Sequence, residues 1–270
     1  MKDLSGRLAL VTGAASGIGR CTALELARWG AELLLVDVDG ERLGEAAREL
    51  ENAGAKAHPF CVDVSDREQV RGLADLVQAR WGPLDILVNN AGFAIYRDLV
   101  FTSVEEWEAL LGANLWGLIH FCNAFVPGMM KRRSGHVVNV ASWMAFFSLP
   151  GSGAYNSTKA AVDAYSSALR YELNRFHVKV TTVYPVIVGT RFYEEIEGNL
   201  WTRLGLKIVP LVAQKPEALA ARIVKAIRSG RRRVLVGLPA FMAFYFGGLL
   251  DLFFEGVGRL VARLTCRREA

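Results

Sequence analysis

The stretch TGAASGIG, from Thr12 to Gly19, decides the fold because it joins an apolar run to a helical pattern. The run RLALV before it predicts a buried strand, and RCTALELARWG after it predicts a helix. The glycines at positions 13, 17 and 19 allow a tight turn and let backbone N–H groups approach a pyrophosphate. Because a helix N-terminus carries positive partial charge, the turn predicts a phosphate-binding site.

The alternation of apolar runs and helical patterns continues along the chain. ELLLVDV precedes ERLGEAARELENAG, KAHPFCVDV precedes REQVRGLADLVQARWG, and helical sequence also separates LDILVNNAG, GHVVNVAS and VKVTTVYP. A last strand, RRVLVG at 232–237, follows a helix for which Pro216 suits the first turn. Strands that are apolar on both sides and spaced by helices predict a parallel sheet covered on both faces. The expected fold class is therefore α/β, with a Rossmann-type doubly wound sheet.

The second apolar run ends in an acidic residue, Asp37, eighteen positions after Gly19. A carboxylate at this place can accept hydrogen bonds from the ribose hydroxyls of a dinucleotide. Its charge also repels a 2′-phosphate, and Ser16 stands where a basic residue would favour that phosphate. We therefore expect NAD as cofactor in preference to NADP.

Tyr155 and Lys159 stand four positions apart in AYNSTKAA, within a segment that predicts a helix. Side chains at this spacing are neighbours on one helix face. A nearby cation favours the phenolate and lowers the pKa of a tyrosine from its usual value of about 10. The pair therefore predicts a tyrosine that exchanges a proton near neutral pH.

Five motifs occur in order along the chain: TGAASGIG, NNAG at 89–92, Asn114 in ANLWG, Ser142 in VNVAS, and Tyr155 with Lys159. Together they resemble the short-chain dehydrogenase/reductase family over about residues 5 to 240. The resemblance implies that Asn114, Ser142, Tyr155 and Lys159 form a catalytic set, with Lys159 also holding the nicotinamide ribose. The cofactor-binding residues that follow from the motifs and the resemblance are Gly13, Ser16, Gly17, Ile18, Gly19, Asp37, Asp63, Val64, Asn90, Ala91, Gly92, Tyr155, Lys159, Pro185, Val188 and Thr190. The sequence departs from the family after the sixth strand, where Val186 replaces the usual glycine.

Aromatic residues follow Ser142 directly, in WMAFF at 143–147. They predict a pocket for an apolar substrate, with packing in the core as the alternative. A further segment from Arg191 to Pro210 resembles the helical lid of the family. The expected substrate-contacting residues are Trp143, Phe146, Phe147 and Tyr193.

The length of 270 residues and the composition fit one domain with a C-terminal appendage. We expect a dinucleotide-binding and catalytic domain over 1–238 and an apolar helical extension over 239–270. The four cysteines and four histidines lack metal-ligand spacing, so no metal site is expected, and reduced thiols fit a cytoplasmic protein. Much of the +5 net charge lies in the last forty residues, so nucleic acid is not an expected partner.

The extension exposes too much apolar surface to be left in water. A narrow polar stripe of Asp251, Glu255, Arg259 and Arg263 divides it at four-residue intervals. A membrane surface, a sister subunit in a homodimer or homotetramer, or the substrate mouth could cover it. Arginines at 231–233 and near the C-terminus suit anionic headgroups, which favours peripheral membrane contact. The two acidic residues argue against a transmembrane span.

The sequence therefore predicts an NAD-dependent oxidoreductase that interconverts a secondary alcohol and a ketone. A bulky apolar substrate, of the steroid, retinoid or long-chain acyl type, is favoured by the aromatic residues. Alternatives are reduction of a small hydroxyketone resembling acetoin or of a 3-oxoacyl thioester, a low-turnover NAD-binding scaffold, and a membrane-surface protein whose dehydrogenase body is only a carrier.

Overall fold

A computed structural model describes residues 1–148, 151–189 and 213–266 of the chain. Within these residues, seven strands form one parallel sheet in the order β3-β2-β1-β4-β5-β6-β7. The strands are β1 (Leu8–Thr12), β2 (Glu32–Asp37), β3 (Ala57–Cys61), β4 (Ile86–Asn89), β5 (Gly135–Val140), β6 (Val178–Tyr184) and β7 (Arg233–Leu235). The predicted doubly wound α/β fold is confirmed.

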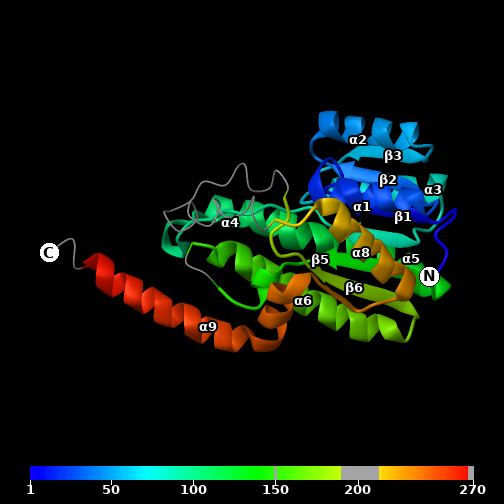
Figure 1. Cartoon of the computed structure of the whole chain (residues 1–270). Helices are drawn as coiled ribbons and strands as arrows, with labels where there is room; N and C mark the ends of the chain where they lie inside the picture. The colour runs from blue at the N-terminus through cyan, green and yellow to red at the C-terminus, as the bar shows by residue number, and fades with distance from the viewer. Residues whose placement is uncertain (149–150, 190–212, 267–270) are drawn as a thin grey trace.

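Helices cover both faces of the sheet (Figure 1). They are α1 (Gly17–Arg28), α2 (Gly40–Asn52), α3 (Arg67–Arg80), α4 (Val104–Leu111), α5 (Gly117–Arg132), α6 (Gly153–Asn174), α8 (Pro216–Ser229) and α9 (Gly237–Cys266). Three short turns, η1 (Leu99–Phe101), η2 (Gly112–Trp116) and η3 (Trp143–Ala145), complete the described elements. Pro216 occupies the first turn of α8, as its sequence predicts.

The core lies in two layers because successive side chains of a strand point to opposite faces. Ala9 and Val11 of β1 pack on the side of α1, α2 and α8. Leu8 and Leu10 of the same strand pack on the side of α3, α5 and α6. This double burial explains why the strands read as continuous apolar runs.

The direction of winding changes beside β1, which pairs with β2 on one side and with β4 on the other. At such a switch point the loops after the two strands diverge and leave a crevice at the carboxyl ends of the strands. The turn at Thr12–Gly19 follows β1, and the NNAG motif follows β4. The fold therefore brings these two motifs together.

The helix α9 begins at Gly237 and bends at Phe246, where the backbone leaves helical geometry. Its first part lies against the α/β body near η3 and α6, and its later part projects away from the body (Figure 1). The expected boundary between residues 238 and 239 falls in the first turn of this helix. Of the predicted polar stripe, the side chains of Asp251, Arg259 and Arg263 lie outside the described residues.

One described helical segment, 104–132, is long and apolar enough to cross a membrane by length and composition. It comprises α4, η2 and α5. Phe121, Phe125 and Met129 of this segment are buried against the sheet, as in the core helix of a globular domain.

Candidate active site

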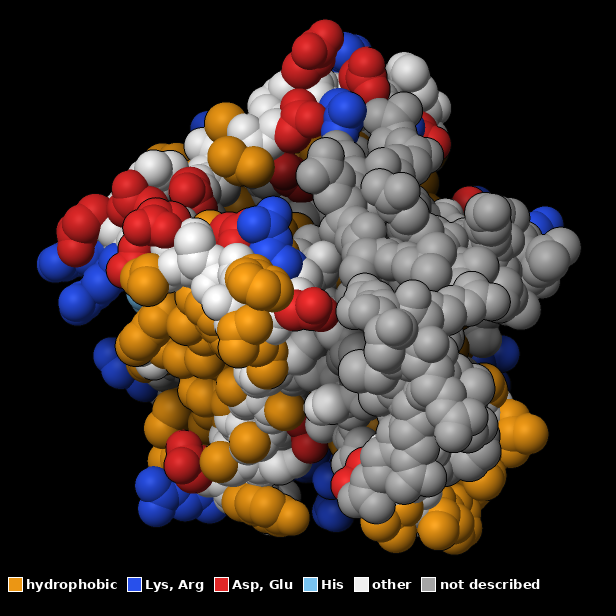
Figure 2. All heavy atoms as spheres, turned by 90° about the vertical axis from the view of Figure 1, so that its left-hand side faces the viewer, with side chains coloured by type: hydrophobic (Ala, Val, Ile, Leu, Met, Phe, Trp, Pro, Cys, Tyr) orange, Lys and Arg blue, Asp and Glu red, His pale blue; other side chains and the backbone are white. Residues whose placement is uncertain are grey.

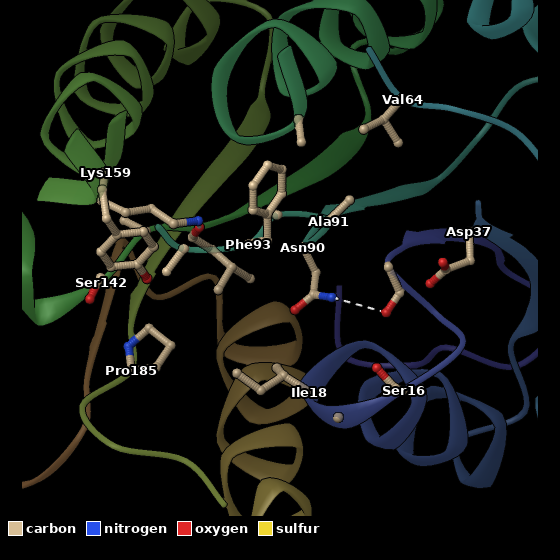
Figure 3. A pocket seen from close by; sticks show the side chains of 18 of the residues that line it. Ser16, Ile18, Asp37, Val64, Asn90, Ala91, Phe93, Ser142, Lys159 and Pro185 are labelled. Atoms are coloured by element: carbon tan, nitrogen blue, oxygen red, sulfur yellow. Dashed lines mark hydrogen bonds between the residues drawn. The ribbon is translucent and has the colours of Figure 1, made fainter. Parts of the chain in front are cut away.

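A groove of about 690 Å³ runs along the carboxyl ends of the strands. Asp37 lies near one end of it, Ser142 and Lys159 lie near the other, and Ile18 and Asn90 lie between them (Figure 3). The groove therefore joins the end of β2 to the end of β5. Its elongated lining suits a ligand with two separated recognition groups.

The glycine turn forms the middle of the groove and is held by the NNAG motif. Gly13 and Gly17 have φ values of 66° and 53°, a region that favours glycine. The Asn90 side-chain N–H group donates to the carbonyl oxygens of Thr12 and Gly13, at 3.0 and 3.2 Å. The Thr12 hydroxyl accepts hydrogen bonds from the backbone N–H groups of Asn90 and Ala91. These bonds fix the turn beside β4 and leave the start of α1 facing the groove.

Asp37 is fixed at the end of β2 by two backbone donors. One of its carboxylate oxygens accepts from the Ala15 N–H at 3.0 Å, and the other from the Asp39 N–H at 3.1 Å. Each oxygen keeps capacity for another donor, such as a hydroxyl group of a ligand.

Arg42 also lines the groove, and sequence reasoning missed it. Its guanidinium lies 3.3 Å from the Asp39 carboxylate. The signal that could have found it is a basic residue in the helix turn directly after the acidic strand end.

Asp63 and Val64 line the groove after β3. The Asp63 carboxylate accepts hydrogen bonds from the backbone and hydroxyl of Ser65, at 2.8 and 2.7 Å. This turn shapes the wall beside Asp37.

Tyr155 and Lys159 lie together on α6, both buried and both facing the groove. The Lys159 Nζ atom lies 5.8 Å from the centroid of the Tyr155 ring and donates to the Val140 carbonyl oxygen at 3.1 Å. Burial lowers the pKa of the Lys159 ammonium to about 8. In its charged form, Lys159 can stabilise the phenolate of the neighbouring tyrosine.

Ser142 follows β5 and lines the groove opposite the glycine turn. Its hydroxyl accepts a hydrogen bond from the Met144 N–H at 3.2 Å, which makes it the cap of η3. Its own proton can then be donated toward the groove.

Asn114 lies in η2, a π-helical turn between α4 and α5. Its side chain accepts from the Phe93 N–H and donates to the Phe93 carbonyl oxygen, both at 2.9 Å. It also donates to the Thr158 hydroxyl at 3.0 Å. Asn114 thus links the loop after β4 to α6 and borders a small cavity beside the main groove.

The predicted site residues come together, with exceptions at the substrate end. The cofactor residues Gly13, Ser16, Gly17, Ile18, Asn90, Ala91, Gly92, Pro185 and Val188 all line the groove. Gly19 lies in the first turn of α1 and packs closely against Gly13 and Asn90. Thr190 and Tyr193, together with the expected lid from Arg191 to Pro210, lie outside the described residues.

The aromatic residues after Ser142 turn away from the groove, and Met144 takes their place in its lining. Phe146 packs against Tyr184, with ring centroids 4.9 Å apart, and Trp143 packs edge-on against Phe147 at 4.8 Å. Among the described residues, Phe93, Ala94 and Tyr96 are further apolar residues of the lining. Trp143, Phe146 and Phe147 thus stand behind the wall rather than on it.

The arrangement fits a dinucleotide. A Cβ atom at Gly13 would lie 2.7 Å from the Asn90 side chain, so a larger residue would displace the amide that holds the glycine turn in place. Asp37 supplies an acceptor at one end. Tyr155, Ser142 and Lys159 supply proton donors at the other, where a carbonyl or alcohol oxygen could react.

Comparison with curated proteins gives relatives over most of the chain. It is 34% identical over 222 residues to the 3-oxoacyl-[acyl-carrier-protein] reductase FabG of Thermotoga maritima, covering 82% of this chain and 90% of the relative. It is 36% identical over 248 residues to estradiol 17-beta-dehydrogenase 11 of Pongo abelii, covering 90% and 78%.

Solved structures share the fold. A short-chain dehydrogenase/reductase from Burkholderia phymatum in complex with NAD superposes with a TM-score of 0.82 at 28% identity, covering 90% of this chain and 93% of that one. A metagenomic short-chain oxidoreductase in complex with NADP gives 0.74 at 29% identity, covering 86% and 97%. The family model for short chain dehydrogenase matches residues 7–200. The chain therefore belongs to the short-chain dehydrogenase/reductase family, whose NAD(P)-dependent oxidoreductases act on CH–OH groups.

Proposed function

We propose that the protein is an NAD-dependent oxidoreductase that interconverts a secondary alcohol and a ketone on a bulky apolar substrate. The observation that carries this proposal is that Tyr155, Lys159 and Ser142 share one groove with the glycine turn and Asp37. A dinucleotide site alone would also fit a scaffold that binds NAD with little turnover. A buried proton donor beside a buried cation supports turnover as well.

The cofactor would lie along the groove from Asp37 to Lys159. The glycine turn and the start of α1 would hold the pyrophosphate, and Asp37 would accept hydrogen bonds from the adenosine ribose. Asp63 and Val64 would flank the adenine, and Pro185 with Val188 would border the nicotinamide. When bound, the nicotinamide supplies or accepts a hydride.

The catalytic residues would act on the oxygen of the substrate. During reduction this oxygen gathers negative charge, so the Ser142 and Tyr155 hydroxyl groups lower the barrier by donating hydrogen bonds to it. Tyr155 then transfers its proton, and during oxidation it removes one. The Lys159 ammonium stabilises the phenolate, and its hydrogen bond to the Val140 carbonyl oxygen fixes it in place.

The wall of Phe93, Tyr96 and Met144 supports an apolar substrate of the steroid, retinoid or long-chain acyl type. The similarity to an estradiol dehydrogenase agrees with this choice. The similarity to a 3-oxoacyl-[acyl-carrier-protein] reductase favours a 3-oxoacyl thioester as the second candidate. A small hydroxyketone would fill less of this wall.

A substrate panel tests the proposal. Secondary alcohols and ketones of increasing chain length, a steroid pair and a 3-oxoacyl thioester would be assayed through NADH absorbance. We expect kcat/KM to rise with chain length, because each buried methylene group adds about 0.8 kcal/mol of transfer free energy. A preference for the shortest substrates would contradict the apolar site, and activity on the thioester alone would support the second candidate.

Tyr155→Phe tests the catalytic assignment on the best substrate of that panel. The ring can keep its packing in the cluster with Met144, Phe147 and Ala243 while the transferable proton is lost. We expect kcat/KM to fall by about 10²- to 10⁴-fold with an unchanged melting temperature and unchanged NADH binding. Tyr171→Phe, an exposed position on the same helix, is the matched control and should retain wild-type activity. Near-normal turnover of Tyr155→Phe would reject the assignment.

We also propose that the protein is cytoplasmic and contacts membranes peripherally through α9. The outward face of this helix carries exposed Leu238, Phe241, Tyr245 and Leu249. Arg231 and Arg232 are exposed at the turn before β7 and suit anionic headgroups. Assembly as a homodimer or homotetramer remains a prediction.

A further inference from the structure

We infer that the first turns of α9 position the catalytic serine, with Gly247 as the positioning residue that permits the contact. The inference rests on the proposed role of Ser142 in catalysis. It assigns a function to the docked face of the C-terminal helix, which lies far from Ser142 in sequence. The contacts run from α9 to Phe146, then through η3 to Ser142.

The inward face of α9 forms part of the packing behind the catalytic residues. Ala243 is fully buried and shares one apolar cluster with Met144, Phe147 and Tyr155. Met144 lines the groove, so Ala243 lies directly behind its wall. A change on this face of α9 therefore reaches the active site through one layer of side chains.

Gly247 lies in close contact with the backbone of the loop after β5. A Cβ atom at this position would overlap the Phe146 carbonyl oxygen and would lie 3.4 Å from the Phe146 Cβ atom. The obstacle is backbone, which cannot rotate away as a flexible side chain could. Any larger residue must therefore push η3 or lift α9. The bend at Phe246 lies directly before this glycine.

Phe244 holds the side chain of Phe146 from the same helix. Their rings meet edge-on with centroids 5.1 Å apart, and the Phe146 ring also packs on Tyr184 of β6. The Arg233 guanidinium lies 4.8 Å from the centroid of the Phe244 ring and covers it. Phe146 is therefore clamped between α9 and the sheet.

The hydrogen bonds of η3 link the position of Phe146 to that of Ser142. Phe146 donates its N–H to the Trp143 carbonyl oxygen at 3.2 Å, and Ala145 donates to the Ser142 carbonyl oxygen at 3.1 Å. Met144 donates to the Ser142 hydroxyl at 3.2 Å. A displacement of Phe146 thus moves the donor that orients the serine hydroxyl. The glycine turn and Asp37 lie on other elements and are not part of this chain of contacts.

Two adjacent glycines provide the test in the full-length protein. Gly247→Ala should lower kcat at least fivefold, while the KM for NADH stays within twofold of wild type. Gly248→Ala is the matched control, because a Cβ atom there meets nothing within 4 Å, and it should retain wild-type kcat. Wild-type kcat in Gly247→Ala, or an equal loss in both variants, would overturn the inference.

A double-mutant cycle with Ser142→Ala separates positioning from general destabilisation. If Gly247 acts through the serine, Gly247→Ala should reduce the residual kcat of Ser142→Ala by less than twofold. The same fold-loss in both backgrounds would overturn the inference. Hydrogen exchange of a peptide spanning 142–147 gives a readout without turnover, and it should quicken in Gly247→Ala but not in Gly248→Ala.

A second pair of variants serves if Gly247→Ala does not fold. Phe244→Leu removes the ring that holds Phe146, and it should lower kcat and quicken exchange of the same peptide. Phe241→Leu changes an exposed ring on the outward face and should do neither. Unchanged kcat and exchange in Phe244→Leu would overturn the inference. If wild type lacks activity, or Tyr155→Phe is fully active, it is instead the proposed function that fails.

Discussion

Asp37 and Arg42 bring opposite charges to the same part of the groove, and we expect the carboxylate to decide coenzyme choice. Asp37 can bind ribose hydroxyl groups, whereas a 2′-phosphate beside it would meet like charge. Asp37→Ala should lower the ratio of kcat/KM for NADH over NADPH by about 10- to 100-fold, corresponding to about 1.4–2.8 kcal/mol. Initial rates with the two coenzymes measure this ratio.

Arg42 provides the control for that experiment. Without Asp37, its guanidinium is a positive charge at this end of the groove and can bind a 2′-phosphate. The double variant Asp37→Ala with Arg42→Ala should therefore lose the gained NADPH activity and keep the weakened NADH activity. A wild-type enzyme that prefers NADPH would contradict the role of Asp37.

His136 gives the protein an acid-sensitive core. It is buried on β5 and its Nε2 atom lies 2.8 Å from the Thr181 hydroxyl. Burial, aided by the N-terminal amino group and Lys179, lowers the pKa of His136 to about 3. Below about pH 6.5 this histidine is protonated in the unfolded chain but stays neutral in the folded chain. The free energy of unfolding therefore decreases as the pH is lowered from about 6.5 to about 3. Above pH 6.5 this histidine leaves stability unchanged.

Urea unfolding at pH 4 to 7 measures this effect. His136→Gln should remove about 1.4 kcal/mol per pH unit from the acid-side slope of the unfolding free energy. His177→Asn is the control, because His177 is exposed and asparagine tolerates its φ of 57°. Equal slopes for wild type and His136→Gln would contradict the assignment.

Residues whose relative positions depend on local spacing were predictable from sequence. The glycine turn and the Tyr155–Lys159 pair each act within one turn, so their geometry follows from the local backbone. The direction of the Phe146 side chain was not predictable. It depends on Tyr184 and Phe244, which lie far away in sequence. Arg42 was missed although it stands in the helix turn directly after the acidic strand end, because a basic residue at that place is only a weak signal when the face of α2 that meets the groove is not known.

At the scale of elements, strands and helices were predictable because their burial is periodic. The π-helical turn η2 was not, since one extra residue in a helical turn leaves no clear mark on the apolar pattern. The docking of α9 was also hidden. Its segment 237–249 is apolar on every side. The sequence therefore indicates that this surface must be buried, but it does not show which face of the helix packs against the α/β body. The structure separates an inward face with Ala240, Ala243 and Gly247 from an outward face.

At the scale of the whole molecule, the outward face of α9 shares one side of the protein with other apolar surface. Exposed apolar residues occur at 238, 241, 242, 245, 246, 249 and 252, a helical spacing, and Val100 and Phe101 of η1 are exposed as well. Figure 2 shows apolar side chains gathered over a broad area of the side from which α9 projects. A membrane on this side would cover the helix, and an apolar substrate could reach the groove from it.

Liposome sedimentation tests this arrangement with the docked face intact. Wild-type protein should pellet with vesicles containing anionic lipid, and less so with neutral vesicles or in high salt, because arginine contacts are screened. Replacing Leu238, Phe241, Tyr245 and Leu249 together by glutamine should weaken binding at least tenfold, since each lost apolar contact costs about 1 kcal/mol or more. Trp116→Gln removes an exposed aromatic ring elsewhere and should bind as wild type does. A different outcome would be that wild type binds no vesicles and that the variant with all four substitutions has a lower oligomer mass in analytical ultracentrifugation. This face would then join subunits, because a buried subunit contact depends on the same apolar side chains but not on lipid charge.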